Sequence, residues 1–188
     1  AFHEHDCSWN ANVDHVVSKA ARALNFIQRN LRLAPRTLKN TAYLTCIRPI
    51  LEYACPVWDP MQANLIDKLE KIQNRAARFV LGRYERRDSC SAMKAELGWE
   101  LLSLRRKKLR LKFFFSVFHG RTGIDRHNYF SEPSYISSRH DHRRKVKEYR
   151  ARTTMFYNSF FVMTIRDWNQ LQDEQVCCIN EELFYSSL

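Results

Sequence analysis

The chain has 188 residues, of which 45% are hydrophobic, and its formal net charge is +11. This length supports one domain or two small domains with a buried core, and the content of four glycines and five prolines argues against a turn-rich β-sandwich and against a disordered chain. The positive charge predicts an anionic partner, either nucleic acid or an anionic membrane surface.

The positive charge is unevenly distributed. Lysine and arginine predominate in residues 67–112 and 121–152, whereas residues 153–188 are acidic. No segment approaches the run of about 20 apolar residues that a membrane span requires, so no membrane-spanning segment is predicted. Nucleic acid is the usual partner of such a charge, and no membrane partner is predicted. The six cysteines show no disulfide-framework spacing, and the first residues do not resemble a signal peptide. These features predict reduced thiols in a nuclear or cytoplasmic protein.

Two helices are predicted in the first part of the chain. Apolar residues at three- and four-residue spacing indicate an amphipathic helix that is capped by Asn12 or Asp14 and ends near Leu31. A second helix is expected after Pro35, with a kink at Pro49. Its apolar face is predicted to carry Leu38, Ala42, Cys46, Ile50 and Ala54.

Residues 48–60 (RPILEYACPVWDP) contain three prolines and a tryptophan, which predicts a rigid structural joint. The helix is expected to stop near Cys55, because a proline disfavours the α conformation of the residue before it. Asp59 should then cap the next helix, with Pro60 at its first position. The predicted structural residues of this joint are Pro49, Pro56, Trp58, Asp59 and Pro60.

A third helix is predicted over residues 61–81, with Gly82 as its C-cap. Its polar side carries Lys68, Lys71, Arg75 and Arg78, which is typical either of a phosphate-binding face or of an ordinary solvated helix. Arg83, Arg86 and Arg87 follow in a loop. A short helix over residues 89–97 should stop at Gly98, and Trp99 should be buried as a structural anchor, with base stacking at the surface as the alternative.

The helix predicted over residues 101–119 is the most basic element. Its core face is expected to contain Leu104, Leu111, Phe115 and Phe118. Six cations lie within eight positions of it, namely Arg105, Arg106, Lys107, Lys108, Arg110 and Lys112. Such closely spaced cations repel one another unless a negative group lies alongside, and a phosphate backbone is expected to be that group.

Residues 120–152 are predicted to form a loop or a poorly ordered basic segment, because glycine, proline and serine interrupt it. Its basic and aromatic side chains include His140, His142, Arg143, Arg144, Lys145, Lys147, Tyr149 and Arg150. This mixture suits phosphate contact and base stacking, and a solvated loop or a nuclear-localisation-like run is the alternative. Residues 156–171 should return to the core, with Trp168 packed there, and residues 173–188 should be peripheral.

These elements predict an all-α fold, an irregular helical bundle of about five to seven helices with a basic loop segment. No metal site is predicted. His3, His5 and Cys7 could bind a metal ion, but no second ligand cluster follows at zinc spacing. His140 and His142 have cationic neighbours, which disfavour a metal ion. Cys177 and Cys178 are adjacent, which is poor geometry for chelation. The chain also lacks a glycine-rich phosphate loop and a serine elbow.

Several stretches keep a fixed order along the chain. Residues 48–60 are followed by LEKIQNRAAR at 69–78, LGWELLSLRR at 97–106, SFF at 159–161 and IRDWNQL at 165–171. In this order they resemble the region after the catalytic core in reverse transcriptases of non-LTR retrotransposons, most closely jockey-like and related LINE elements. The resemblance implies a helical thumb-like domain at 1–119, a basic loop or linker at 120–152 and a C-terminal helical tail at 153–188.

Reverse transcriptases use paired aspartates to bind two metal ions, which are expected to be magnesium in the parent polymerase. This sequence has no Asp-Asp dipeptide. Two-metal catalysis requires such carboxylates. No catalytic residue and no cofactor are therefore predicted in this chain. The resemblance implies that the catalytic aspartates lie upstream of Ala1 in a parent RNA-directed DNA polymerase, so that this chain performs no polymerisation by itself.

The resemblance implies that the chain binds the RNA and DNA of a template–primer hybrid through its basic helices and loop. The predicted contact residues are Arg75, Arg78, Arg86, Arg87, Arg105, Arg106, Lys107, Lys108, Arg110, Arg143, Arg144 and Lys145, with Trp99 and Trp168 as structural residues. The alternative is an inactive or repurposed transposon remnant that acts as a helical protein-interaction domain. The sequence indicates no particular protein partner.

Overall fold

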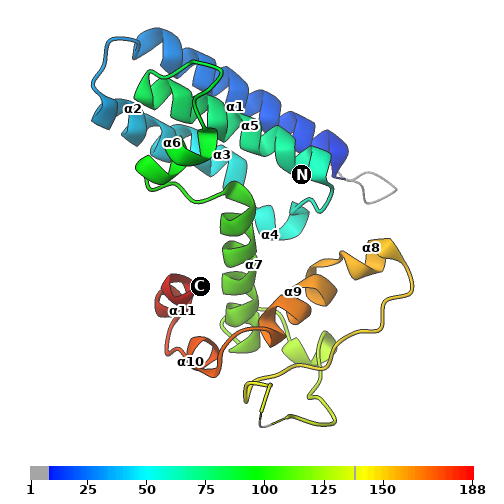
Figure 1. The fold of residues 1–188 in the computed structure, drawn as a ribbon. Coiled ribbons are helices and arrows are strands. Elements are labelled where there is room, and N and C mark those ends of the chain that lie inside the picture. Colours follow the sequence, from blue (N-terminus) through cyan, green and yellow to red (C-terminus); the bar gives the residue numbers. More distant parts are fainter. Residues whose placement is uncertain (1–8, 138) are drawn as a thin grey trace. The chain divides into compact units, whose positions relative to one another are not determined.

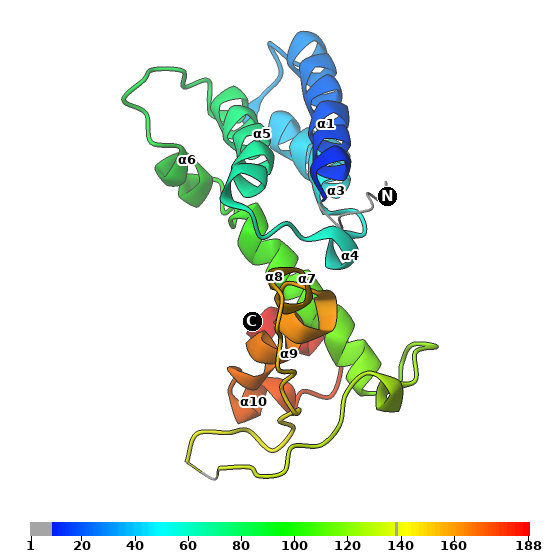
Figure 2. The ribbon, with the colours of Figure 1, turned by 90° about the vertical axis from the view of Figure 1, so that its right-hand side faces the viewer.

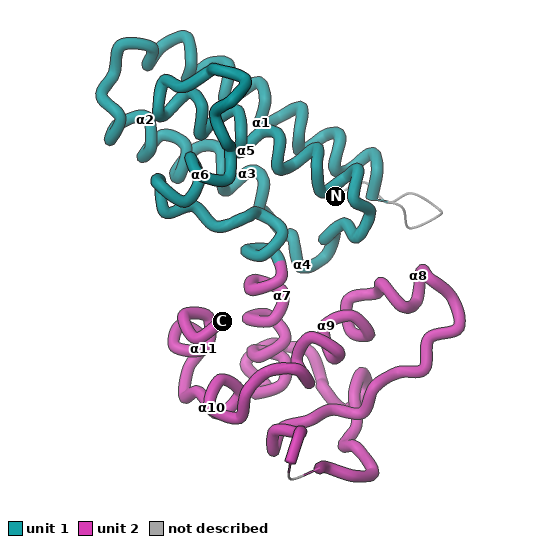
Figure 3. The backbone as a smooth tube through the Cα atoms, in the orientation of Figure 1, with its two compact units in different colours: residues 1–106 teal, residues 107–188 magenta. Residues whose placement is uncertain are grey.

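The computed structural model describes residues 9–137 and 139–188, and within them the chain is all-α, with no strand. The chain divides into two compact units, residues 1–106 and residues 107–188 (Figure 3). This division falls inside helix α7 (Leu102–Phe118), whereas the predicted segments end at residues 119 and 152. The predicted number of five to seven helices is too low, because the region after Pro35 and the acidic end each form several short helices.

The first unit contains two long helices, α1 (Asn10–Asn30) and α5 (Ala63–Leu81), which pack along each other (Figure 1). The apolar side of α5 is buried, from Leu65 to Phe79. Gly82 ends α5 with φ of 67°, as predicted, because glycine adopts this left-handed conformation without a Cβ clash. The prediction for the start of α1 was wrong, since Trp9 occupies the N-cap position.

Helix α2 (Arg36–Ala42), the π-helical segment η1 (Tyr43–Ile47) and α3 (Arg48–Glu52) follow one another without a break. Segment α2 contacts α5, whereas η1 and α3 contact α1. Figure 2 shows α3 beside α1. The predicted apolar face of this run was wrong, since Leu38 is 47% exposed and Cys46 is exposed, whereas Tyr43, Ile47 and Leu51 are buried. The ring of Tyr43 stacks on that of Trp99, with the centroids 3.9 Å apart, and this contact helps to set the face that turns inward.

The joint after α3 also differs from its prediction. Helix α3 ends at Glu52 rather than near Cys55, Ala54 has a positive φ of 53°, and another short helix, α4 (Cys55–Trp58), follows. Helix α5 begins at Ala63 with Gln62 as its N-cap. Asp59 therefore does not cap α5 and Pro60 is not its first residue.

The physical reason is that Asp59 has a different partner, because its carboxylate accepts a hydrogen bond from the guanidinium of Arg106. Pro60 is buried ahead of α5. Trp58 is also buried, and its Nε1 donates to the carbonyl of Tyr53 at 2.8 Å. The joint is thus held by side chains that turn inward.

Helix α6 (Cys90–Glu96) confirms the prediction of a short helix before Gly98. The Oγ of Ser89 accepts a hydrogen bond from the backbone N–H of Ala92, and Gly98 has φ of 66°. Trp99 follows and is 8% exposed, with its Nε1 donating to Oδ1 of Asn40 at 3.0 Å. Trp99 is therefore buried rather than displayed for base stacking.

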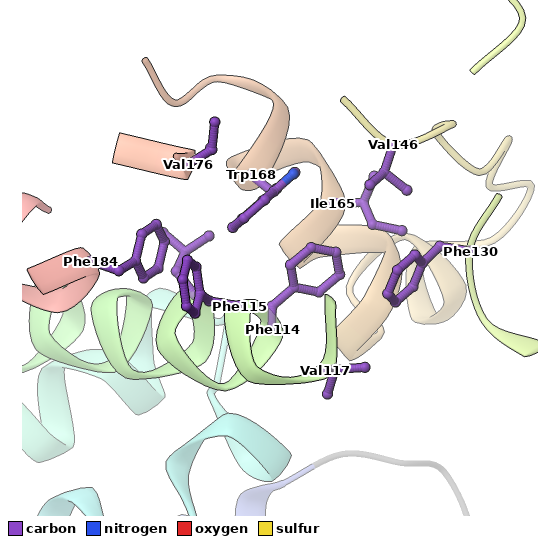
Figure 4. Close-up of a cluster of buried hydrophobic side chains, with 10 residues drawn as sticks. Phe114, Phe115, Val117, Phe130, Val146, Ile165, Trp168, Val176 and Phe184 are labelled. Atoms are coloured by element: carbon purple, nitrogen blue, oxygen red, sulfur yellow. The ribbon is translucent and has the colours of Figure 1, made fainter. Parts of the chain in front are cut away.

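In the second unit, α7 packs with α9 (Phe160–Asn169), α10 (Asp173–Val176) and α11 (Glu181–Ser187) around one apolar cluster (Figure 4). Phe114 and Phe115 of α7 point toward Trp168, and the ring of Phe115 stacks on that of Phe184 at 4.6 Å. Val176 and Phe184 are both fully buried. The acidic end is thus not peripheral, because each of its short helices contributes a core residue.

Between α7 and α8 (Thr154–Tyr157), the described residues form only one short helical element, η2 (Arg126–Asn128). This segment is nevertheless held by specific contacts, since Phe130 and Val146 are buried and the N–H of Lys147 donates to the carbonyl of Ser131 at 3.0 Å. The predicted loop is present in its described part.

Candidate nucleic-acid interface

Helix α7 carries the cations that were expected to face phosphate, yet it turns two of them inward. Arg106 and Arg110 are 0% and 3% exposed. Leu104, which was predicted to belong to the core face, is instead 43% exposed. A buried guanidinium is costly unless a carboxylate pairs with it, so the partners of these arginines decide what α7 can bind.

In the first unit, two carboxylates pair with cations of α7. Glu52 accepts two hydrogen bonds from Arg105, one of them from Nη2 to Oε2 at 3.1 Å. Asp59 accepts a hydrogen bond from Nε of Arg106 at 2.8 Å. The carboxylate side chains are only 13% and 8% exposed, so salt in the solvent screens these pairs weakly.

In the second unit, one carboxylate serves two cations. Oδ1 of Asp167 lies 2.9 Å from Nζ of Lys107, and Oδ2 accepts a hydrogen bond from Nη2 of Arg110. Lys112 pairs with Glu182, whose side chain is 80% exposed. Lys108, the remaining cation of the run, is half-buried.

The chain itself therefore supplies negative groups where a phosphate backbone was expected to supply them. Glu52 and Asp59 belong to residues 48–60, and Asp167 belongs to residues 165–171, two of the stretches that carry the family resemblance. The structure gives these stretches a local role, which is to neutralise the basic helix. A fully buried and paired Arg106 offers no surface to a ligand.

The predicted contact residues of α5 also have partners within the first unit. Arg75 donates through Nη2 to the side-chain oxygens of Asn25 and Gln28 on α1. Arg78 donates to the backbone carbonyls of Glu85 and Asp88, at 3.1 and 3.3 Å. Both arginines thus hold neighbouring chain segments in place.

The loop after α5 is more open. Arg86 and Arg87 are exposed, and Arg87 pairs with Glu85 at 2.7 Å while its side chain stays 85% exposed. Arg83 pairs with Glu96 at 2.7 Å. Tyr84 is 62% exposed beside them, so this loop presents charge and one aromatic ring to solvent.

The basic segment of the second unit is fixed to α9. Nε1 of Trp168 donates to the carbonyl of Arg144 at 2.8 Å, and Asn169 exchanges two hydrogen bonds with the backbone of Val146, at 3.0 and 2.8 Å. His142 is 4% exposed; its Nδ1 accepts from the N–H of Arg144, and its Nε2 lies 2.9 Å from the carbonyl of Trp168. These bonds select the neutral ring with a proton on Nε2.

The three predicted contact residues in this segment have different surroundings. Arg143 is exposed, with Nε 3.6 Å from Oδ2 of Asp173. Arg144 donates to the carbonyl of Val176 at 2.8 Å and to Nε2 of His119 at 2.7 Å. Lys145 pairs with Asp141 at 2.7 Å. Among the three, only Arg143 presents its side chain fully to solvent.

His119 is surrounded by cations. Burial and the guanidinium groups of Arg144, Arg121 and Arg126 lower the pKa of His119 to about 4. Burial likewise lowers the pKa of His142. Both rings are therefore neutral at physiological pH, and His119 acts as a hydrogen-bond acceptor inside the second unit.

A group of exposed side chains follows this fixed segment, and the sequence predicted a binding role for only three of them, Lys147, Tyr149 and Arg150. Lys147, Arg150 and Arg152 are exposed, and no carboxylate among the described residues pairs with their side chains. Four apolar or aromatic side chains lie beside them in the sequence and are also exposed, namely Tyr149, Met155, Phe156 and Tyr157. Thr153 and Ser159 flank the short helix α8. Serine and threonine favour helix N-caps, so these two residues were the signal in the sequence that a separate turn precedes the core helix α9.

No group of three His, Cys, Asp or Glu side chains in the described parts of the chain is arranged to hold a metal ion. His3, His5 and Cys7 lie outside the described residues. None of the cysteines that the structure describes, at 46, 55, 90, 177 and 178, forms a disulfide. Within residues 9–137 and 139–188, no helix has the length and apolar character to cross a membrane.

The chain was also compared with known proteins. No family model, no curated protein and no solved structure matches it.

Proposed function

We propose that this chain is a helical nucleic-acid-binding module of a non-LTR-type RNA-directed DNA polymerase and that it binds the RNA and DNA of a template–primer hybrid. The order of the stretches at 48–60, 69–78, 97–106, 159–161 and 165–171 supports the family assignment. The catalytic aspartates and their magnesium ions would belong to another part of the parent polymerase, because the chain contains no Asp-Asp pair.

The observation that carries the proposal is the set of exposed cations at Lys147, Arg150 and Arg152, which have no carboxylate partner among the described residues. An exposed, unpaired cation can approach a phosphate and release a condensed counterion, which is the main source of sequence-independent affinity for nucleic acid. The paired cations of α7 cannot do this without first separating from Glu52, Asp59 or Asp167.

The salt dependence of binding to an RNA–DNA hybrid tests this proposal. Neutralising Lys147, Arg150 and Arg152 to glutamine should reduce the slope of log K against log salt by about 0.9 for each phosphate that the chain no longer binds. The matched control neutralises the three exposed cations Lys19, Arg22 and Arg29 of α1, and should leave the slope close to that of the wild type. Equal slopes for both variants and the wild type would refute the proposal.

A second candidate function is a repurposed transposon remnant that acts as a helical protein-interaction domain. It is favoured by the neutralisation of α7, because Arg105, Arg106 and Arg110 already have carboxylate partners. Exposed apolar side chains on the first unit, including Phe26 at 61% and Leu33 at 92%, fit the same reading. Competition separates the two functions, since a template–primer-binding module should prefer the hybrid over heparin at moderate salt and a remnant should not.

A further inference from the structure

Four exposed apolar or aromatic side chains lie at the end of the basic segment, and we call this group the aromatic platform: Tyr149, Met155, Phe156 and Tyr157. They are 40%, 59%, 43% and 49% exposed. The rings of Tyr149 and Phe156 meet edge to face, with the centroids 5.9 Å apart and the planes at 71°. Large side chains of this kind are usually buried, so their exposure indicates a surface available for binding.

The backbone under the platform is held by local hydrogen bonds. The Oγ1 of Thr153 accepts from the N–H of Phe156 at 3.2 Å, which caps the start of α8, and Oγ of Ser159 donates to the carbonyl of Phe156 at 2.7 Å. Figure 1 shows α8 between the irregular segment and α9. Aromatic rings on a fixed turn lose little conformational freedom when a flat ligand stacks on them.

Arg166 of α9 supports one ring of the platform. Its Cζ lies 3.4 Å from the ring centroid of Tyr157, and its Nη2 donates to the carbonyl of Tyr157 at 3.0 Å. The guanidinium therefore stacks on one face of the ring, while 49% of Tyr157 remains exposed. A planar ligand placed on Tyr157 would extend an existing stack.

The charge next to the platform indicates the sign of the ligand. Lys147, Arg150 and Arg152 lie on the chain directly before α8 and are exposed, and Glu148 is the only acidic residue among residues 143–157. An apolar surface alone would suit a protein or a membrane, but cations next to aromatic rings suit the phosphates and bases of an unpaired nucleic-acid strand. In a duplex the base faces are stacked on each other and cannot be reached.

We infer that the aromatic platform binds unpaired nucleotides of single-stranded RNA or DNA, with bases stacked on Tyr157 and Phe156 and phosphates at Arg150 and Arg152. This inference rests on the proposed function, to which it adds a preference for the single-stranded part of a template over its duplex part. Stacking on a ring tolerates any base, so the platform provides strand selectivity without sequence selectivity.

The test compares ligands that differ only in their bases. Fluorescence anisotropy is measured for the whole chain with labelled oligothymidylate and with an abasic deoxyribose-phosphate oligomer of equal length. The wild type should bind the abasic oligomer about tenfold more weakly, since stacking of each base is worth a factor of this order. A chain carrying Phe156→Ala and Tyr157→Ala should bind both oligomers alike, and Tyr53→Ala should behave as the wild type because Tyr53 is an exposed ring far from the platform in sequence.

The outcomes are distinguishable. Equal affinity of the wild type for the two oligomers would refute base stacking on the aromatic platform. This comparison uses the wild type alone, so it does not depend on whether a variant folds. If salt-dependent hybrid binding is retained in that case, the proposed function stands without the platform. Failure to bind the hybrid and both oligomers would refute the proposed function and this inference together.

Discussion

Nε of Arg106 lies 2.8 Å from Oδ1 of Asp59, and the two side chains are 0% and 8% exposed. The ion pair joins the first turns of α7 to the end of the proline-rich joint. Nη1 and Nη2 of Arg106 are also buried and have no hydrogen-bond partner among the described residues. Asp59 therefore offsets a guanidinium that is otherwise expensive to bury.

This pair predicts unequal effects of its two halves on stability. Asp59→Ala should lower the free energy of unfolding by about 3–5 kcal/mol, because it leaves a buried charge without this carboxylate. Arg106→Met should cost less, since it removes the under-satisfied guanidinium and keeps an apolar side chain of similar length. Urea unfolding followed by circular dichroism measures both. A smaller loss of stability for Asp59→Ala than for Arg106→Met would contradict the assignment.

The neutral histidines of the second unit predict acid sensitivity. The pKa of His119 is about 4 in the folded chain and about 6.5 in an unfolded chain, so between these values the unfolded state binds a proton that the folded state does not. The stabilising contribution is complete above pH 6.5 and is lost as the pH falls toward 4. The Tm of His119→Gln should therefore fall less between pH 7 and pH 5 than the Tm of the wild type. Replacement of the exposed His127 by Gln, as a control, should leave the wild-type pH dependence.

The indole of Trp168 predicts the local stability of the basic segment. Trp168→Phe removes the hydrogen bond to the carbonyl of Arg144 and part of a buried ring, which should cost about 2–3 kcal/mol. Hydrogen exchange should show faster exchange at the amide of Val146. Trp58→Phe is the matched control, because it removes a similar bond to Tyr53 in the first unit. It should leave the Val146 amide protected, and equal exposure of that amide in both variants would argue against the contact.

Ala54 is the only non-glycine residue with a positive φ in the described chain, at 53°. An alanine in this conformation is strained by roughly 1–2 kcal/mol, whereas glycine costs more entropy in the unfolded state. Ala54→Gly should therefore raise the free energy of unfolding by about 0.5 kcal/mol. In the middle of α1, Ala23→Gly should lower it by about 1 kcal/mol. Urea unfolding measures both variants, and effects of the same sign would show that Ala54 is not strained.

Features set by local sequence were predictable. The extent of α5, its end at Gly82 and the Ser89 cap of α6 depend on residues within a few positions of each other. The face of α2 and η1 was not predictable in this way, because Tyr43 faces inward against Trp99, which lies much further along the chain.

The candidate interface shows the same limit. A run of six cations can be counted in the sequence, but the carboxylates that accept hydrogen bonds from Arg105, Arg106 and Arg110 include Glu52, Asp59 and Asp167, which lie 53, 47 and 57 residues away. Periodicity also could not tell that Arg106 turns inward and Leu104 outward, since an arginine with a buried carboxylate partner occupies a core position as a large side chain does. The exposure of Phe156 and Tyr157 was likewise not predictable, because it depends on α9 beginning after these two residues and not including them.

The ion pairs of α7 have an evolutionary consequence. A change of sign at position 52 or 59 is harmful unless position 105 or 106 changes with it, and a change at position 167 affects both 107 and 110. In related sequences these positions are therefore expected to co-vary, with oppositely charged or jointly neutral combinations. Such a pattern would identify distant relatives by their matched charges even where the surrounding residues have diverged.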